Sequence, residues 1–230
     1  METGSSTTVL TTAFDQIVSS RRSVRGFKAE PVPAAVLRSV FSLAQQCPSN
    51  CNTQPWIVHV VSGEKCKALS TKISEAMMLG QMTLDFPYEG KYAGLHKERQ
   101  YDAAQQLYSA MGIAREDKAK RAEAFARNFD FFGAPHVAFL FIPEQFGMRE
   151  AADLGMYAQT LMLSLVAHGF ASCPQTALSF CSDLVRAELG VDNSLKLMFG
   201  ISFGYEDSEV AANNARVGKA PLEQVVTFHQ

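Results

Sequence analysis

Residues 153–169, DLGMYAQTLMLSLVAHG, constrain the fold most, because apolar side chains occur almost all around the helix they would form. A helix without a broad polar face needs cover on nearly every side. The segment is shorter than the roughly 20 residues that cross a bilayer, and no other apolar run reaches that length. It therefore predicts a central buried helix, which Gly169 would end.

Other patterns predict a mixture of helices and strands. After Pro31 and Pro33, apolar residues recur at three- and four-residue steps up to Ala44, as in a helix with one buried face. Further helices are predicted at residues 63–77 and 183–189, and strands at residues 56–61, 137–142 and 195–203. Strand 137–142, VAFLFI, is continuously apolar, which predicts burial on both faces.

These elements predict one α+β domain over residues 1–230. The length and the 47% hydrophobic composition suffice for a sizeable core, and no repeat, linker or low-complexity tract divides the chain. Residues 80–128 are charged and rich in Tyr, Lys, Arg and Gln. We expect them to form a helical excursion from the domain.

Charge and cysteine content argue against several classes of function. The 21 basic and 23 acidic residues are well mixed and give a formal net charge of −2, so no field favours nucleic acid or a membrane surface. Residues 1–10 lack the features of a targeting segment, which predicts a cytoplasmic protein. Five cysteines without metal-type spacing and five scattered histidines predict neither disulfides nor a metal site.

An arginine-rich stretch, RRSVR, occupies residues 21–25. In an extended chain the side chains of Arg21, Ser23 and Arg25 point to the same side. Two guanidinium groups and a hydroxyl on one side suit a dianionic phosphate, and a solvated basic turn is the alternative interpretation.

Arg216 and Lys219 form a second basic cluster, in NNARVGKAPLE. They would complete the same anion site if the two ends of the chain meet. The glycine-rich phosphate loops G-x-G-x-x-G and G-x-x-x-x-G-K-[ST] are both absent. A phosphate held by side chains favours a mononucleotide cofactor over a dinucleotide in a Rossmann fold.

The stretch CPSNCNTQPW, residues 47–56, collects short amide and hydroxyl side chains. Such a loop suits a flat polar heterocycle such as a flavin, because it offers donors and acceptors without covering the ring. Ordinary turn chemistry explains each residue taken singly. The combination with a phosphate-type cluster earlier in the chain favours the cofactor interpretation.

Four motifs in this order resemble the FMN-dependent nitroreductase family: RRSVRGF, PSNCNTQPW, GFASCPQTAL, and GISFGYED followed by ARVGKAPLE. The resemblance runs from about residue 14 to residue 226. Residues 88–121 further resemble the subgroup that includes nitrobenzoate reductases. The family likeness implies a three-layer sandwich with a central mixed sheet, which dimerises through the central helix and holds two FMN molecules at the dimer interface.

The resemblance also implies a set of cofactor-binding residues. The FMN phosphate would be bound by Arg21, Arg22, Ser23, Arg25, Arg216 and Lys219. The flavin of the other subunit would be lined by Pro48, Ser49, Asn50 and Asn52, in a loop that Gln54 would fix. The turn of Pro174, Gln175 and Thr176 would direct a main-chain N–H at the reactive flavin nitrogen, and Asn128 would meet the pyrimidine edge of the ring.

In this family NADPH or NADH reduces FMN and leaves, and a small aromatic acceptor then enters the same site. The resemblance therefore implies ping-pong reduction of nitroaromatics or quinones, with no catalytic acid, base or nucleophile from the protein. Two alternatives stay open: the same fold used for reductive dehalogenation, enone reduction or flavin breakdown, and a non-catalytic flavin- or nucleotide-binding protein.

Overall fold

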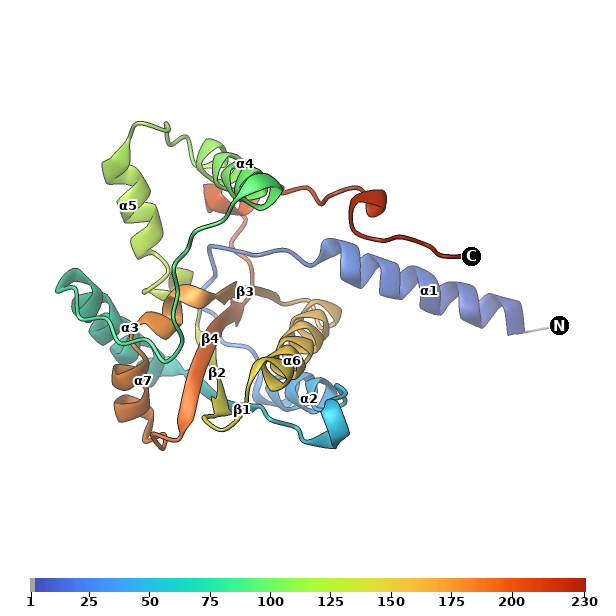
Figure 1. Cartoon of the computed structure of the whole chain (residues 1–230), viewed down its shortest axis with the longest axis horizontal. Helices are drawn as coiled ribbons and strands as arrows, with labels where there is room; N and C mark the ends of the chain where they lie inside the picture. The colour runs from blue at the N-terminus through green and yellow to red at the C-terminus, as the bar shows by residue number, and fades with distance from the viewer. Residues whose placement is uncertain (1–2) are drawn as a thin grey trace.

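A four-stranded sheet forms the middle layer of the computed structural model, which describes residues 3–230 (Figure 1). Residues 1–2 of the segment considered for targeting lie outside the described residues. The strands, in the sheet order β1-β2-β4-β3, are β1 (Ile57–Ser62), β2 (His136–Pro143), β4 (Leu195–Gly204) and β3 (Ala171–Gln175). The helices are α1 (Thr3–Ser20), α2 (Ala34–Ala44), α3 (Gly63–Met78), α4 (Gly94–Ala110), α5 (Lys118–Ala126), α6 (Met148–Ala167) and α7 (Ser182–Leu189).

The α+β class and the sandwich architecture agree with the sequence prediction, but the sheet is antiparallel rather than mixed. All three strand pairs are antiparallel. Strands β2 and β3 do run in the same direction, because α6 returns the chain to the same end of the sheet. Strand β4 then lies between them, so they are not neighbours. In the described residues, parallel pairing is confined to isolated bridges such as Ser23 with Ser172.

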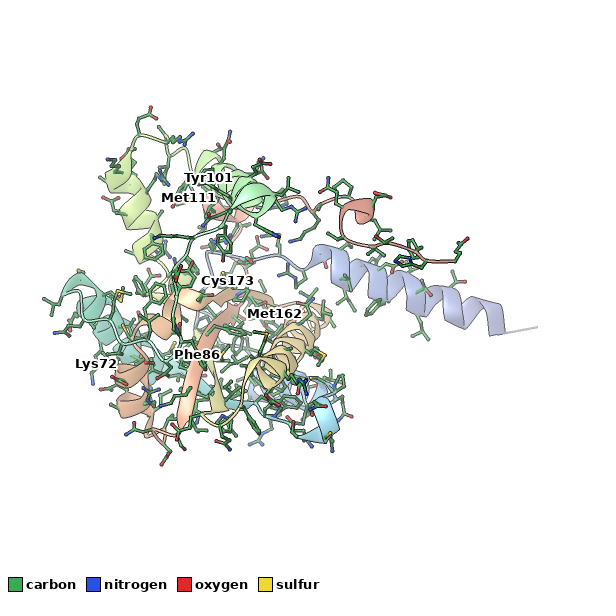
Figure 2. The ribbon with its side chains drawn as sticks, viewed as in Figure 1. Lys72, Phe86, Tyr101, Met111, Met162 and Cys173 are labelled. Atoms are coloured by element: carbon green, nitrogen blue, oxygen red, sulfur yellow. The ribbon has the colours of Figure 1, made fainter. Side chains whose placement is uncertain are left out.

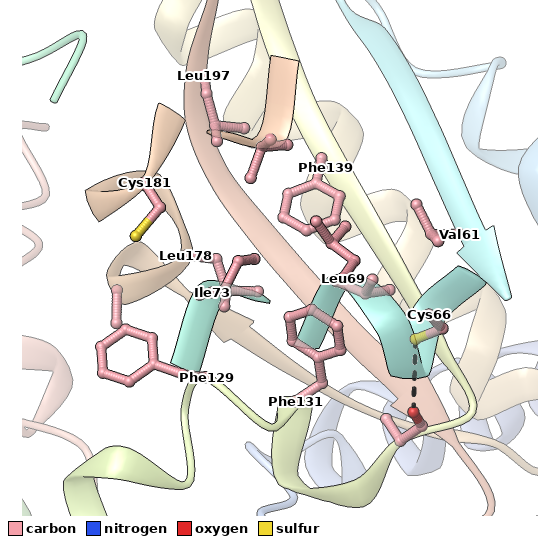
Figure 3. Packing of buried hydrophobic residues seen from close by; sticks show 14 of the residues in the cluster. Val61, Cys66, Leu69, Ile73, Phe129, Phe131, Phe139, Leu178, Cys181 and Leu197 are labelled. Carbon is pink, nitrogen blue, oxygen red and sulfur yellow. Dashed lines mark hydrogen bonds between the residues drawn. The ribbon is translucent and has the colours of Figure 1, made fainter. Parts of the chain in front are cut away.

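Strand β2 is buried on both faces, as its apolar sequence predicts, and the side chains on its two faces belong to two separate hydrophobic cores. Val137, Phe139 and Phe141 pack with α3 and α7 on one side. The alternating residues Ala138 and Leu140 pack with α2 and α6 on the other side. Figure 3 shows part of the first core, and its dashed line marks the hydrogen bond that the Cys66 thiol donates to the carbonyl of Ala134.

The central helix α6 starts five residues before the predicted position, at Met148. The carboxylate of Glu150 accepts a hydrogen bond from the N–H of Gly147 at 2.9 Å, which satisfies one donor at the start of the helix. Gly169 follows the helix at a φ of 81°, in agreement with its predicted role as the stop. None of the helices within residues 3–230 has the length and apolar character needed to cross a bilayer.

The excursion contains α4 and α5, and two further elements were not predicted from the pattern. Helix α1 projects from the rest of the molecule, with its C-terminal end beside α6 (Figure 1). Strand β3 pairs with β4 at the edge of the sheet. The chain between α1 and α2 runs beside β3, and this arrangement brings the arginine-rich segment to the sheet edge.

Candidate cofactor site

The arginine-rich segment lies in an extended conformation against β3. The N–H of Val24 donates to the carbonyl of Ser172 at 3.0 Å, and the Val24 side chain is buried. The side chains of Arg21 and Arg25 are both close enough to Cys173 for their charges to affect its thiol. Burial raises the pKa of Cys173 to about 11, and the positive charges of Arg25 and Arg21 oppose this rise. The structure thus brings the two predicted phosphate ligands to one side of the sheet edge, which Cys173 marks in Figure 2.

Arg22 has a different partner from the two arginines around it. Its guanidinium forms an ion pair with Glu206, a residue on the chain that follows β4. Alternation along an extended segment explains why Arg22 points away from Arg21 and Arg25. Its side chain is therefore engaged in holding two parts of the chain together.

The predicted meeting of the two chain ends is observed at Arg25 and Arg216. The N–H of Arg25 donates to Oδ1 of Asn213 at 2.6 Å. The guanidinium of Arg216 donates to the carbonyls of Asn213 at 2.7 Å and Ala215 at 3.0 Å. Lys219 is exposed and lines a hollow of about 1150 Å³ between α4 and the C-terminal segment.

The predicted turn of Pro174, Gln175 and Thr176 lies at the C-terminal end of β3. Pro174 and Thr176 are exposed, and Thr176 begins the short 3-10 helix η3 (Thr176–Phe180), whose first N–H groups lack partners inside the helix. The Gln175 side chain is buried and points the other way: its Nε2 donates to the carbonyl of Asn128 at 2.9 Å and to Oδ1 of Asn128 at 3.2 Å. The Ser202 hydroxyl donates to Oε1 of the Gln175 side-chain amide. Gln175 thus fixes Asn128 beside the turn.

The polar loop is strained and tightly held. Three of its non-glycine residues, Cys51, Asn52 and Gln54, have positive φ angles of 50°, 56° and 46°. Such angles persist only where surrounding contacts impose them. The carboxylate of Asp153, on α6, accepts from the N–H of Asn50 at 3.0 Å, and Ser49 Oγ accepts from the N–H of Gln54 at 2.9 Å.

These contacts leave much of the loop exposed. The exposed members include Pro48, Asn50 and Asn52, whereas Ser49 is half-buried. Gln54 donates from its side chain to the carbonyl of Asn52 at 3.2 Å, in line with its predicted role of fixing the loop.

Within one chain the loop and the arginine segment lie far apart. The loop is bonded to Asp153 near the start of α6, whereas the end of α1, just before Arg21, packs beside Val166 near the end of α6. These two positions on α6 are about 20 Å apart at a rise of about 1.5 Å per residue. The loop also precedes β1 and the arginines adjoin β3, at opposite edges of the sheet. The structure therefore divides the predicted site residues into two separate groups.

Three residues of this region were not predicted from the sequence. Asp153 and Asn213 are buried polar side chains that hold the loop and the arginine segment. Gly26 lies so close to Val210 that an added Cβ would be 2.4 Å from the valine side chain. Asp153 could have been singled out as an acidic residue within an otherwise apolar helix. No local sequence pattern indicates the roles of Asn213 and Gly26.

The fold and the four motifs define a flavoprotein class, and comparison with known proteins identifies the family. The nitroreductase family model matches residues 18–205. The chain belongs to the nitroreductase family.

Particular relatives match over nearly their whole length. The nitroreductase NfnB of Mycolicibacterium smegmatis is 47% identical over 220 residues, covering 95% of this chain and 94% of the relative. A 4-nitrobenzoate reductase of Pseudomonas putida is 34% identical over 220 residues, covering 96% and 97%. The crystal structure of FMN-dependent NfnB from Mycobacterium smegmatis in complex with NADPH superposes with a TM-score of 0.93 at 46% identity, covering 96% of this chain and all of that chain.

Proposed function

We propose that the protein is an FMN-dependent oxidoreductase that uses NADPH or NADH to reduce nitroaromatics or quinones. The observation that carries this proposal is the convergence of Arg21, Ser23 and Arg25 on the edge of β3, next to the turn at Pro174 and Thr176. Similar proteins with this fold are described as FMN- and NADPH-dependent nitroreductases, which supports the same cofactors here.

The residues at this edge fit the phosphate of FMN. Within residues 3–230, Arg22 forms an ion pair, but neither Arg21 nor Arg25 does, so their guanidinium groups are available for a phosphate. Ser23 adds a hydroxyl, and Arg216 lies on the neighbouring segment. A side-chain phosphate site without a glycine-rich loop matches a mononucleotide.

When bound, FMN would supply the chemistry of hydride transfer between NAD(P)H and the acceptor. The chain would bind and orient the cofactor for this chemistry: the arginines would hold the phosphate, and a main-chain N–H of the turn after Pro174 would serve the reactive edge of the ring. Fixed main-chain donors stabilise negative charge there without reorganising. Because the cofactor would supply the hydride-transfer chemistry, the proposal assigns no acid or base to the protein.

We also propose a homodimer that forms through α6 and α1. The sheet covers one face of α6, but Met156 on the other face is 41% exposed, and Leu163 and Val166 are only half-buried. On α1, Leu10 and Phe14 are 69% and 59% exposed. Apolar faces of this kind indicate an interface, and a second copy of the chain would cover both helices.

In this dimer the loop of one chain would line the flavin held by the arginines of the other. The wide separation of the two groups within a chain supports this division, since each group by itself is an incomplete site. A cytoplasmic location fits the cysteines, all five of which are free thiols.

Purification followed by denaturation tests the proposed cofactor. We expect FMN to be released, flavin absorbance to bleach with NADPH or NADH, and the colour to return on addition of a nitroaromatic or a quinone. Release of FAD alone, or a flavin that neither nucleotide reduces, would refute the proposal. Steady-state oxidation of NAD(P)H that depends on the acceptor separates an enzyme from a non-catalytic flavin-binding protein.

Subunit mixing tests the shared site. An Arg25→Ala chain paired with an Asn52→Ala chain gives a heterodimer with one doubly altered site and one intact site. If each variant alone has low activity, the mixture should recover toward half of the wild-type activity per heterodimer. A monomer by sedimentation, or no recovery after confirmed exchange, would contradict the shared site.

A further inference from the structure

Asn213 occupies the junction between the arginine segment and the C-terminal basic segment. It is the next-to-last residue of the short 3-10 helix η4 (Ala211–Asn214), and it is only 2% exposed. A buried amide is costly unless its donors and acceptor are all bonded. The three bonds of this side chain therefore show what the residue holds.

The side chain of Asn213 bonds to two separate segments. Its Oδ1 accepts from the N–H of Arg25 at 2.6 Å. Its Nδ2 donates to the carbonyl of Gly26 at 2.9 Å and to the carbonyl of Asp207 at 2.8 Å. The amide orientation follows from its partners, because a flipped amide would place a donor against the N–H of Arg25 and an oxygen against two carbonyls.

The main chain of Asn213 also holds a cation. Its carbonyl accepts from the Arg216 guanidinium at 2.7 Å. One residue thus fixes the backbone that carries Arg25 and the side chain of Arg216. No other residue in the described part of the chain bonds to both arginines.

We propose that Asn213 is a positioning residue for the phosphate end of the cofactor, coupling the two basic segments into one anion site. The inference rests on the proposed FMN-dependent function. Asn213 does not itself contact the phosphate in this account: it acts through Arg25 and Arg216. Its loss should therefore weaken the phosphate contacts and leave the contacts to the flavin ring unchanged.

The test compares FMN with riboflavin, which has the same ring and no phosphate. Apoprotein of wild type, Asn213→Ala and the control Asn214→Ala is titrated with each ligand, following flavin fluorescence. Asn214 is the exposed neighbour of Asn213. We expect Asn213→Ala to raise the Kd for FMN about tenfold, which is the effect expected from the loss of one buried hydrogen bond. The Kd for riboflavin should stay within about twofold of the wild-type value.

A general loss of structure would weaken both ligands alike, so equal losses for FMN and riboflavin would overturn the inference. An unchanged Kd for FMN would also overturn it. Wild-type protein that binds no FMN, or binds FMN and riboflavin equally, would instead contradict the proposed function.

Hydrogen exchange on the wild-type protein covers the case in which Asn213→Ala does not fold. FMN should slow amide exchange in residues 23–28 and 210–217 together, and riboflavin should protect neither segment to that extent. Protection of residues 23–28 alone would show that the two segments are not coupled, and would refute the role of Asn213.

Discussion

Replacing Arg25 by alanine should remove affinity for FMN while leaving the fold nearly intact. Among residues 3–230 the Arg25 guanidinium forms no ion pair, and its one hydrogen bond there is to the carbonyl of Ser23 at 3.3 Å. The backbone of Arg25 stays bonded to Asn213 in the variant. We therefore expect the free energy of unfolding to change by no more than about 0.5 kcal/mol, as for substitutions away from core contacts.

The loss of affinity follows from the chemistry of the contact. A hydrogen bond between a guanidinium and a phosphate contributes about 1.5–3 kcal/mol, which corresponds to a roughly ten- to hundredfold rise in Kd. Titration of the apoprotein with FMN measures this change, and urea unfolding of the same apoprotein measures the stability.

Arg22→Ala is the matched control, because it removes the same group from the adjacent residue. Arg22 pairs with Glu206, and both side chains are partly exposed. Its loss should cost up to about 1 kcal/mol of stability and have little effect on FMN. The assignment of the phosphate site would be wrong if both variants lost FMN affinity equally, or if Arg25→Ala bound FMN normally.

Two further predictions concern buried charged and titratable groups. Burial lowers the pKa of His136, and its Nε2 accepts a hydrogen bond from the N–H of Val32 at 2.8 Å. The folded protein therefore keeps the His136 imidazole neutral at a pH where the unfolded chain, below about pH 6.5, binds a proton on it. The free energy of unfolding should therefore fall as the pH drops below about 6.5. Urea unfolding measured across this pH range should show a smaller dependence on pH for His136→Gln than for the wild type. An unchanged dependence would contradict its assignment to His136. Asp85 forms an ion pair with Arg186, and both side chains are 6% exposed. Asp85→Ala should therefore lower the free energy of unfolding, measured in urea, by about 3–5 kcal/mol. Arg186 also pairs with the exposed Asp183, and Asp183→Ala should lower it by less than about 1 kcal/mol. Equal costs would show that burial of the pair is unimportant.

Periodicity predicted the elements that form the two cores. Helices α2, α3, α6 and α7 and strands β1, β2 and β4 all contribute apolar residues to these cores, and their observed bounds lie within a few residues of the predicted ones. Helix α1 was missed because its 18 residues are rich in Ser and Thr, which have weak helix propensity. Strand β3 was missed because it is short and contains Pro174, which an edge strand tolerates.

The candidate site was predictable in its residue types and less so in its arrangement. Alternation along an extended chain correctly placed Arg21 and Arg25 on one side, whereas the cofactor-lining role that the motifs predict for the loop at residues 48–52 stays a prediction. The partner of Arg22 is Glu206, 184 residues away, and the partner of Arg25 is Asn213, 188 residues away. No local pattern encodes such contacts, because they depend on how the sheet brings the two ends of the chain together.

The position of Asp153 connects the burial of α6 with the polar loop at residues 48–52. Asp153 is 4% exposed, and its carboxylate accepts from the N–H of Asn50, so it links the central helix to the loop. The left-handed residues of the loop are costly by themselves, at about 1–3 kcal/mol each, and anchoring to α6 offsets part of that cost. If α6 is the dimer contact, a second chain that covers its exposed face also fixes the helix that carries this anchor. Dimer formation and completion of the flavin site would then stabilise each other, because both depend on the same helix.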